Sequence, residues 1–215
     1  MLFLLTFVIL RLFRQLGENM KILFCTDGSE ISLIALGNAS KFIKEATVDI
    51  ICVIDWSFLP ESMNIDYENY SKTYETIADS VLIYAEKEII EKKLTPNKKI
   101  KSFGSAAEGI LEQLDKEDYD LVVIGSHGKK GIQKWLGSVS RQVVSNAKVP
   151  IFISKKKTKG QKILFTTDGS DLAYGAVKHA VKLFDFHKKE IYIISVKENP
   201  ELLPIEAAMD KNWLE

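Results

Sequence analysis

The sequence predicts an α/β protein: a five-stranded, doubly wound parallel sheet of the Rossmann-like type, followed by a partial β-α-β repeat. Between residues 20 and 154, five short apolar runs alternate with segments of helical periodicity. These runs lack a polar face, as expected of parallel strands that are buried on both sides. The nonapeptide at 21–29 also returns at 162–170 with eight of nine residues identical. A complete domain and the start of a second copy explain all three observations.

Composition limits the class of protein. The chain has 215 residues, 46% hydrophobic and 27% charged, which is ordinary for a soluble globular protein of one or two domains. Its formal net charge is zero, so it lacks the basic surplus of an electrostatic nucleic-acid binder. Cys25 and Cys52 lie inside apolar runs and form no CxxC motif, which favours a reducing compartment and a cytoplasmic location.

Residues 1–19 form an apolar extension that stands apart from the domain. Ten apolar or small residues are followed by Arg11 and Arg14, and the run is half the length needed to span a bilayer. The charges follow the apolar run, unlike those of a signal peptide. We expect translation to begin at Met20, with a weak membrane-surface anchor as the alternative. A membrane partner is not expected from the rest of the chain.

The first elements follow in order from residue 20. Residues 21–25 form an apolar strand that ends in a turn, and Ser29 is a plausible cap for a helix over 30–43. A second buried strand covers 48–54, interrupted only by Asp49. A long helix is predicted over 67–93, with an apolar stripe at spacings of three and four. That stripe comprises Tyr70, Tyr74, Ile77, Val81, Ala85 and Ile89.

The second half of the domain completes the alternation. A weak strand at 100–103 precedes a helix marked by Ala107 to Leu114, and a strongly apolar strand at 121–124 runs into Gly125. A helix at 138–147 leads to the last strand at 149–154, where Pro150 suits an edge position. Strict β-α alternation predicts a parallel sheet with right-handed crossovers, helices on both faces and a domain over 20–154.

A charged linker at 155–161 separates this domain from the partial repeat, 162–215. A strand, a helix and a strand ending at Val196 align on the first copy. The repeat is interpreted either as a truncation remnant, which we favour, or as a working element that covers a sheet edge. A lone β-α-β unit buries little core, so Asp168 is not counted as a second site and residues after Lys155 are expected to be protease-sensitive.

Two strands end in loops suited to binding a ligand. In an open parallel sheet, ligands lie beyond the carboxyl ends of the strands, where the strand order reverses. The first strand ends at Asp27, a carboxylate that suits ribose hydroxyls, a base or a metal ion. The fourth strand ends at Gly125. If these strands are neighbours, both loops face one crevice.

The loop after the fourth strand has features of a phosphate site. Gly125 and Gly128 let backbone N–H groups approach an anion, and Gly137 with Ser138 opens a helix whose N-terminus favours phosphate. The intervening cations, Lys129 and Lys130, could steer phosphate. Each feature also has a plainer interpretation: a tight turn, a helix cap or a solvated face.

Several linked motifs resemble the universal stress protein family. They are the stretch from Ile22 to Ser29, the stretch from Asp120 to Gly128, and Gly137-Ser-Val-Ser140 followed by Val149-Pro-Ile. The resemblance covers residues 20–154 completely and 161–196 again in part. It implies a five-stranded parallel α/β sheet, a mostly cytoplasmic location and a role in stress responses, often without demonstrated catalysis.

The resemblance also implies site residues. The ATP-binding branch carries Gly-x2-Gly-x9-Gly-(Ser/Thr), whereas here eight residues separate Gly128 from Gly137, one fewer than the pattern. Asp27 would then hold the adenosine and Val53 the adenine. The phosphates would contact Gly125, Gly128, Gly137 and Ser138, and less strongly Ser140. Dimers would form through the last strand, Val149 to Ser154, or as a pseudo-dimer with the second repeat.

Three functions follow from these observations. The favoured one is an ATP-binding stress-response or signalling module, with or without Mg²⁺, that acts through ligand-dependent conformation or partner choice and hydrolyses ATP slowly at most. The shortened loop favours an alternative, a dimeric interaction protein that binds no nucleotide. A phosphoryl- or adenylyl-transferring enzyme ranks last, because the chain has no Walker lysine, no evident general base and no structural metal cluster. We name no catalytic residue, and His127 is interpreted as a turn residue.

Overall fold

The structure is a computed structural model that describes residues 20–55, 67–127 and 136–195; over 67–71 it describes the backbone alone. Several residues of the sequence analysis lie outside this part of the chain. They are residues 1–19, the loop residues Gly128, Lys129 and Lys130, and the end of the partial repeat from Val196 onwards.

Five parallel strands form the main sheet, in the order β3-β2-β1-β4-β5. They are β1 (Met20–Cys25), β2 (Ala46–Ile54), β3 (Thr95–Phe103), β4 (Leu121–Gly125) and β5 (Ile151–Ser154). The chain winds outward from β1 to β3, then crosses to β4 and β5 on the other side. The predicted doubly wound parallel sheet is therefore confirmed, with β1 and β4 as neighbours and Pro150 just before an edge strand.

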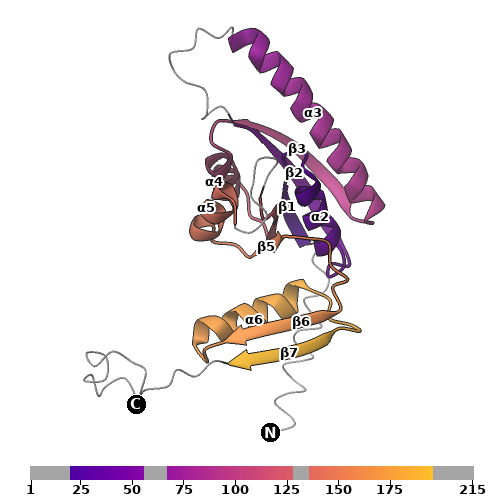
Figure 1. Cartoon of the computed structure of the whole chain (residues 1–215), viewed down its shortest axis with the longest axis vertical. Coiled ribbons are helices and arrows are strands. Elements are labelled where there is room, and N and C mark those ends of the chain that lie inside the picture. Colours follow the sequence, from indigo (N-terminus) through magenta and orange to yellow (C-terminus); the bar gives the residue numbers. More distant parts are fainter. Residues whose placement is uncertain (1–19, 56–66, 128–135, 196–215) are drawn as a thin grey trace, which may run out of the picture.

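Helices cover both faces of this sheet (Figure 1). Helices α2 (Glu30–Ala39) and α3 (Tyr67–Glu91) lie on one face, and α4 (Ala106–Lys116) and α5 (Ser138–Asn146) on the other. Strand residues alternate between the two cores: Phe24 and Ile50 face α2 and α3, whereas Leu23 and Ile51 face α4 and α5. All four are at most 1% exposed, which is why these strands carry no polar face.

Three elements differ from the sequence prediction. Helix α2 ends at Ala39, because Ser40 closes its last turn, although Ile43 beyond it is still buried. Strand β3 begins five residues earlier than predicted, at Thr95, since an edge strand needs few apolar residues to pair. In α3 the predicted stripe is partly wrong: Ile77 is 48% exposed, and the neighbouring positions Ala78 and Leu82 are buried instead.

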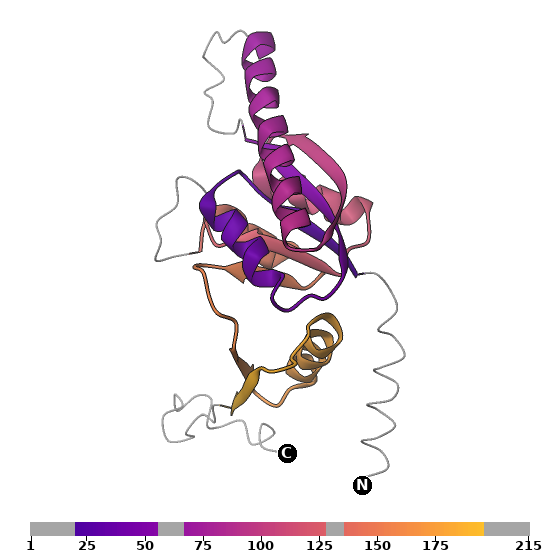
Figure 2. The ribbon, with the colours of Figure 1, turned by 90° about the vertical axis from the view of Figure 1, so that its right-hand side faces the viewer.

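The second repeat forms a separate β-α-β unit. Strands β6 (Lys162–Thr167) and β7 (Glu190–Ser195) pair in parallel, and α6 (Asp171–Leu183) lies along one face of the pair (Figures 1 and 2). Residues that are buried in the first copy are open here: Leu164, the counterpart of Leu23, is 53% exposed, and Ile193 of β7 is 72% exposed. Local sequence thus reproduces the elements without the core that surrounds them in the first domain.

An aromatic cluster fastens this unit to the first domain. The Phe184 ring lies 6.1 Å from Phe42 and 6.2 Å from Phe152, measured between centroids. Beside it, the Asp185 N–H donates to the Phe42 carbonyl at 2.6 Å, and the Asp185 carboxylate lies 3.5 Å from Lys44. These contacts join the end of α6 to the corner between α2 and β2.

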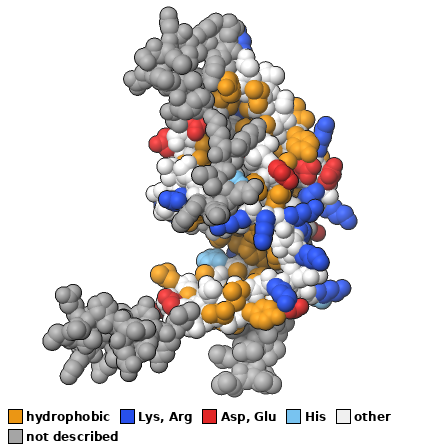
Figure 3. All heavy atoms as spheres, in the orientation of Figure 1, with side chains coloured by type: hydrophobic (Ala, Val, Ile, Leu, Met, Phe, Trp, Pro, Cys, Tyr) orange, Lys and Arg blue, Asp and Glu red, His pale blue; other side chains and the backbone are white. Residues whose placement is uncertain are grey.

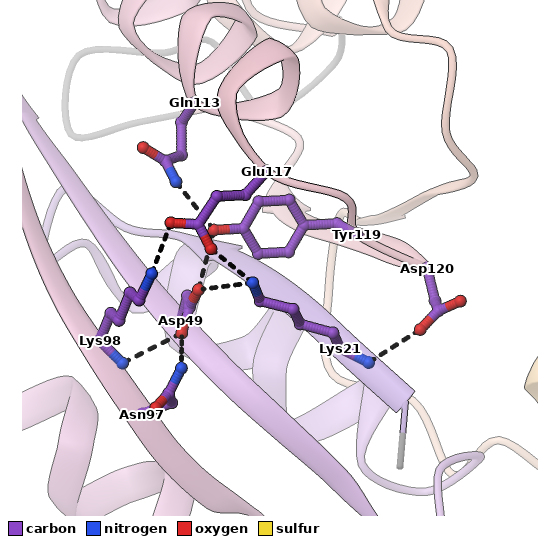
Figure 4. A network of polar contacts seen from close by, with 8 residues as sticks. All are labelled: Lys21, Asp49, Asn97, Lys98, Gln113, Glu117, Tyr119 and Asp120. Carbon is purple, nitrogen blue, oxygen red and sulfur yellow. Dashed lines mark hydrogen bonds and ion pairs between the residues drawn. The ribbon is translucent and has the colours of Figure 1, made fainter. Parts of the chain in front are cut away.

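A polar network lies at the amino ends of the strands, opposite the edge where a ligand was expected (Figure 4). Asp49 of β2 is completely buried. Its carboxylate accepts from the Tyr119 hydroxyl at 2.9 Å, the Asn97 side chain at 2.7 Å and the Lys98 N–H at 3.0 Å. It also lies 3.6 Å from the Lys21 ammonium. Asp49 thus stabilises the place where the β2–β3 register shifts.

Glu117 makes the outer part of this network sensitive to pH. Lys21 and Lys98 hydrogen-bond its carboxylate at 2.5 and 2.6 Å and lower its pKa from 4.5 to about 2. Because this pKa is lower in the folded state, the charged carboxylate stabilises the fold above pH 4.5, and that stability is lost as the pH falls towards 2. The free energy of unfolding, measured by urea denaturation at pH 6, 4 and 2.5, should fall with falling pH, and it should fall less in Glu117→Gln. The same fall with pH in the two proteins would contradict this assignment.

Candidate functional site

Two loops meet where β1 and β4 end. Cys25 lies beside Ile124 in the β1–β4 register, so the turn after β1 and the loop after β4 leave the sheet next to each other. The strand order reverses here, since β1 leads outward to β2 whereas β4 lies on its other side. The candidate site requires β1 and β4 to be neighbours, and in this sheet they are.

Hydroxyl and carboxylate groups build the turn after β1. The Asp27 carboxylate accepts the Ser29 N–H at 3.0 Å, and the Thr26 hydroxyl accepts the Gly28 N–H at 3.1 Å. Ser29 caps α2 through the Ser32 N–H at 3.4 Å, and the hydroxyls of Thr26 and Ser32 share a hydrogen bond of 2.8 Å. The turn therefore holds Asp27 at the start of α2 with its side chain exposed.

The second copy repeats the backbone N–H bonds of this turn, but it lacks the bond between the Thr26 and Ser32 hydroxyls because Ala173 stands at the position of Ser32. Asp168 accepts the Ser170 N–H at 2.9 Å, and Thr167 accepts the Gly169 N–H at 3.0 Å. Both central glycines have positive φ, +73° at Gly28 and +85° at Gly169. The surroundings differ: a Cβ at Gly28 would meet a Val81 methyl of α3 at 2.7 Å, whereas one at Gly169 would meet nothing within 4 Å. Among the residues that the structure describes, a helix packs against the first turn and none packs against the second.

Gly125 is needed for helix packing. A Cβ at this position would lie 2.8 Å from an Ile31 methyl and 3.1 Å from the Ser32 backbone nitrogen. The missing side chain therefore lets the start of α2 pack directly on the end of β4. This contact sets the distance between the Asp27 turn and the loop after Gly125.

The start of α5 faces the same edge. Gly137 occupies the N-cap and supplies no side-chain acceptor, and the first turn contains no acidic residue. The Gly137 N–H donates to the Ser126 carbonyl at 2.7 Å, which ties α5 to the end of β4. Ser138 is exposed, whereas the buried Ser140 hydroxyl donates to the Gly125 carbonyl at 2.8 Å. A helix start without an acceptor favours an anion.

Val53 lies near the end of β2, on the sheet face that α4 and α5 cover. A Cβ at Gly109 of α4 would meet its methyl groups at 3.2 and 3.3 Å, so α4 packs closely on it. Strand β2 is next to β1 and lies farther from β4, and Val53 thus flanks the Asp27 side of the edge. The Nδ1 atom of His127 lies 2.9 Å from the hydroxyl oxygen of Ser126.

The structure brings together the predicted residues Asp27, Gly125, Gly137, Ser138 and Ser140 at one edge of the sheet. Within the described ranges, no group of three or more His, Cys, Asp or Glu side chains could hold a metal ion. The sequence analysis missed two bracing residues, Ser32 and Ser126. A hydroxyl one turn into α2 was the available signal for Ser32, whereas the backbone role of Ser126 leaves no trace in its side chain.

Comparison with known proteins places this geometry in context. A model of the Universal stress protein family matches residues 18–155. Universal stress protein MJ0531 of Methanocaldococcus jannaschii is 31% identical over 160 residues, which cover 66% of this chain and 87% of the relative. Universal stress protein MJ0577 of the same organism is 27% identical, over 64% of this chain and 95% of the relative.

Solved structures share the fold. The structure of MJ0577 aligns with a TM-score of 0.55 and 28% identity, over 65% of this chain and 98% of that one. A universal stress protein from Archaeoglobus fulgidus aligns with a TM-score of 0.64 over 83% of this chain and 66% of that one, at 23% identity. The second alignment extends past the first domain and supports the fold alone.

Proposed function

Because this chain belongs to the universal stress protein family, we propose that it binds ATP at the edge where β1 and β4 meet and acts as a stress-response or signalling module. The observation that carries the proposal is the pairing of an exposed carboxylate, Asp27, with the start of α5, which has no side-chain acceptor. One end suits hydroxyl donors of a ribose, and the other suits phosphate oxygens.

Each predicted residue has a role in this proposal. Asp27 accepts from the ribose, Val53 lies beside the adenine, and the backbone N–H groups of the first turn of α5, beginning at Ser138, face the phosphates, with Gly137 as the N-cap that leaves them uncovered. Gly128, Lys129 and Lys130 complete the phosphate loop in the proposal and lie outside the described residues. Gly125 and Ser140 contribute indirectly. The missing side chain of Gly125 lets α2 pack on β4, and the Ser140 hydroxyl holds α5 to the Gly125 carbonyl. Mg²⁺, where present, would be held mainly by the phosphates.

The same site gives a mechanism for signalling without catalysis. Asp27 lies three residues before the first residue of α2, and Phe42, three residues beyond its last residue, contacts Phe184 of the second repeat. A nucleotide that fixes the Asp27 turn would fix α2 against β4. Partner choice would then follow nucleotide occupancy, and hydrolysis is expected to be slow at most.

The shortened glycine loop favours a second candidate function, a dimeric interaction protein that binds no nucleotide. Strand β5 is the outer strand of the main sheet, and its free edge suits a second copy. In this case Asp27 serves only to cap its own turn. Association through β5 belongs to either function, so nucleotide binding separates them.

Calorimetric titration of ATP with Mg²⁺ into the whole chain tests the proposal. Asp27→Ala should weaken binding about 10- to 100-fold, because hydrogen bonds to a charged group contribute about 1.5–3 kcal/mol. Asp168→Ala is the matched control, since it removes the same turn bond from the second copy. It should bind ATP as the unchanged chain does. Equal losses in both variants, or no binding by the folded unchanged chain, would favour the interaction protein.

A further inference from the structure

The second repeat exposes apolar side chains on the face of its sheet that α6 only partly covers. Ile191 and Ile193 of β7 are 49% and 72% exposed, and Tyr174 and Val181 of α6 are 61% and 42% exposed. We call these four residues the open apolar surface. Figure 3 shows hydrophobic side chains at the surface of this unit, in the lower part of the view. Single exposed apolar residues are normal, whereas a group of them marks an interaction site.

The first repeat covers the same strand face with a helix. The strand registers make Ile191 and Ile193 of β7 the counterparts of Val48 and Ile50 of β2. Both counterparts are completely buried. They share one core with four residues of α3, namely Ala78, Leu82, Ala85 and Ile89. The strand face that stands open in the second repeat is therefore the one that α3 closes in the first.

The exposed side of α6 matches the side of α2 that meets α3. A Cβ at Gly37 of α2 would lie 3.6 Å from the side chain of Lys92, which directly follows α3. Gly37 corresponds to Lys178 of α6, since each is the eighth residue after the N-cap of its helix. Tyr174 and Val181 lie four residues before and three residues after Lys178, on the same side of α6. Helix and strand thus present their apolar residues towards one vacant helix position.

Positive charge accompanies the open apolar surface. Lys178 stands between Tyr174 and Val181 along the helix, and its ammonium lies 4.4 Å from the centre of the Tyr174 ring. Within the described residues, neither Lys178 nor Lys182, one turn further along α6, forms an ion pair with a carboxylate. Helix α3, by contrast, has six acidic residues and two lysines. An acidic helix therefore complements the surface in both charge and polarity.

We infer that the open apolar surface binds an acidic amphipathic helix of a partner protein, in the position that α3 occupies in the first repeat. Such a helix carries apolar residues at positions i, i+4, i+7 and i+11, the spacing of the four α3 residues in the core. An acidic residue beside this stripe pairs with Lys178. The inference does not depend on nucleotide binding, because the surface lies wholly in the second repeat. It gives that repeat a role as a binding module.

Fluorescence anisotropy with a labelled peptide of residues 73–93, which is the α3 sequence of this chain, tests the inference. The full chain should bind this peptide saturably without ATP, so the result is independent of the proposed nucleotide site. Ile193→Asp should weaken binding about 10- to 100-fold, as the loss of one large buried aliphatic side chain implies. Lys178→Gln should weaken it only about 2- to 5-fold, because exposed ion pairs contribute little. A peptide with Leu82→Asp and Ile89→Asp should not bind.

Ile194→Asp is the matched control. Ile194 is the next residue of β7, is 46% exposed and points to the opposite face of the strand, so this variant should bind the peptide as the unchanged chain does. Equal losses in the two variants would overturn the inference. Peptide binding that appears only after removal of residues 196–215 would also overturn it and assign the surface to the chain's own end. A dimer in sedimentation equilibrium that Ile193→Asp alone dissociates would overturn it in favour of a second copy.

Discussion

Replacing Asp49 with alanine should lower the free energy of unfolding by about 3 kcal/mol, measured by urea denaturation at pH 7. The carboxylate is fully buried, and four groups point their donors at it: the Tyr119 hydroxyl, the Asn97 amide, the Lys98 N–H and the Lys21 ammonium. Without the acceptor, the buried Tyr119 hydroxyl loses its partner, and the part-buried hydrogen bonds from Asn97 and Lys98 are lost with it.

Asp49→Asn separates charge from hydrogen bonding. Its carbonyl oxygen can still accept from Asn97 and Lys98, whereas its NH₂ group would face the Tyr119 hydroxyl and the Lys21 ammonium. We therefore expect roughly half of the alanine effect. A loss below about 1 kcal/mol in Asp49→Ala would show that the network contributes little to stability.

Gly125→Ala should destabilise the domain by about 1–3 kcal/mol. The new methyl group would stand 2.8 Å from Ile31 and 3.1 Å from the Ser32 nitrogen, and the helix backbone cannot give way as a flexible side chain would. Displacement of α2 would also move the Asp27 turn, so ATP affinity should fall together with stability. Differential scanning calorimetry and titration of the same sample measure the two effects.

Gly37→Ala is the matched control, because Gly37 lies in α2, the helix that packs against Gly125. A Cβ at Gly37 would meet only the end of the Lys92 side chain, at 3.6 Å. Alanine is favoured over glycine inside a helix, so this variant should be more stable by about 0.5–1 kcal/mol and keep its ATP affinity. Destabilisation by both variants would contradict the view that Gly125 is required by close packing against α2.

Apolar patterning was enough to predict the main sheet and its helices. The runs that contain Phe24, Ile50 and Val123 are apolar because both faces of each strand are covered, and that coverage specifies a parallel sheet. The predicted helical stripe was wrong at Ile77, because the choice between adjacent apolar positions depends on the crossing of α3 over β2 and β3, which no local pattern encodes. The length of strand β3 was underestimated because an edge strand can pair with few apolar residues.

Long-range contacts account for what the sequence could not supply at the candidate site. Asp27 was identified because it follows the first strand at the carboxyl edge of the sheet, and the N–H bond that its carboxylate accepts forms in both copies of the motif. The Val81 side chain that packs against this turn belongs to α3, more than fifty residues away in the sequence. In the second copy, no described residue lies within 4 Å of a Cβ built at Gly169. The packing role of Gly125 and the brace from Ser140 likewise depend on contacts across the sheet. The buried network around Asp49 appeared in the sequence only as one interruption of an apolar run.

The most direct test of the proposed site is a ¹H–¹⁵N NMR titration of the whole chain with ATP and Mg²⁺. The proposal predicts saturable shifts of the amide signals of Gly28, Ser29, Ser138 and Val139, with the Gly169 and Ser170 amides unchanged. Those residues belong to two loops that meet only at the end of β1 and β4, so joint shifts place the nucleotide there. Shifts confined to other surfaces, or equal shifts in the turn of the second copy, would contradict an ATP site at this edge.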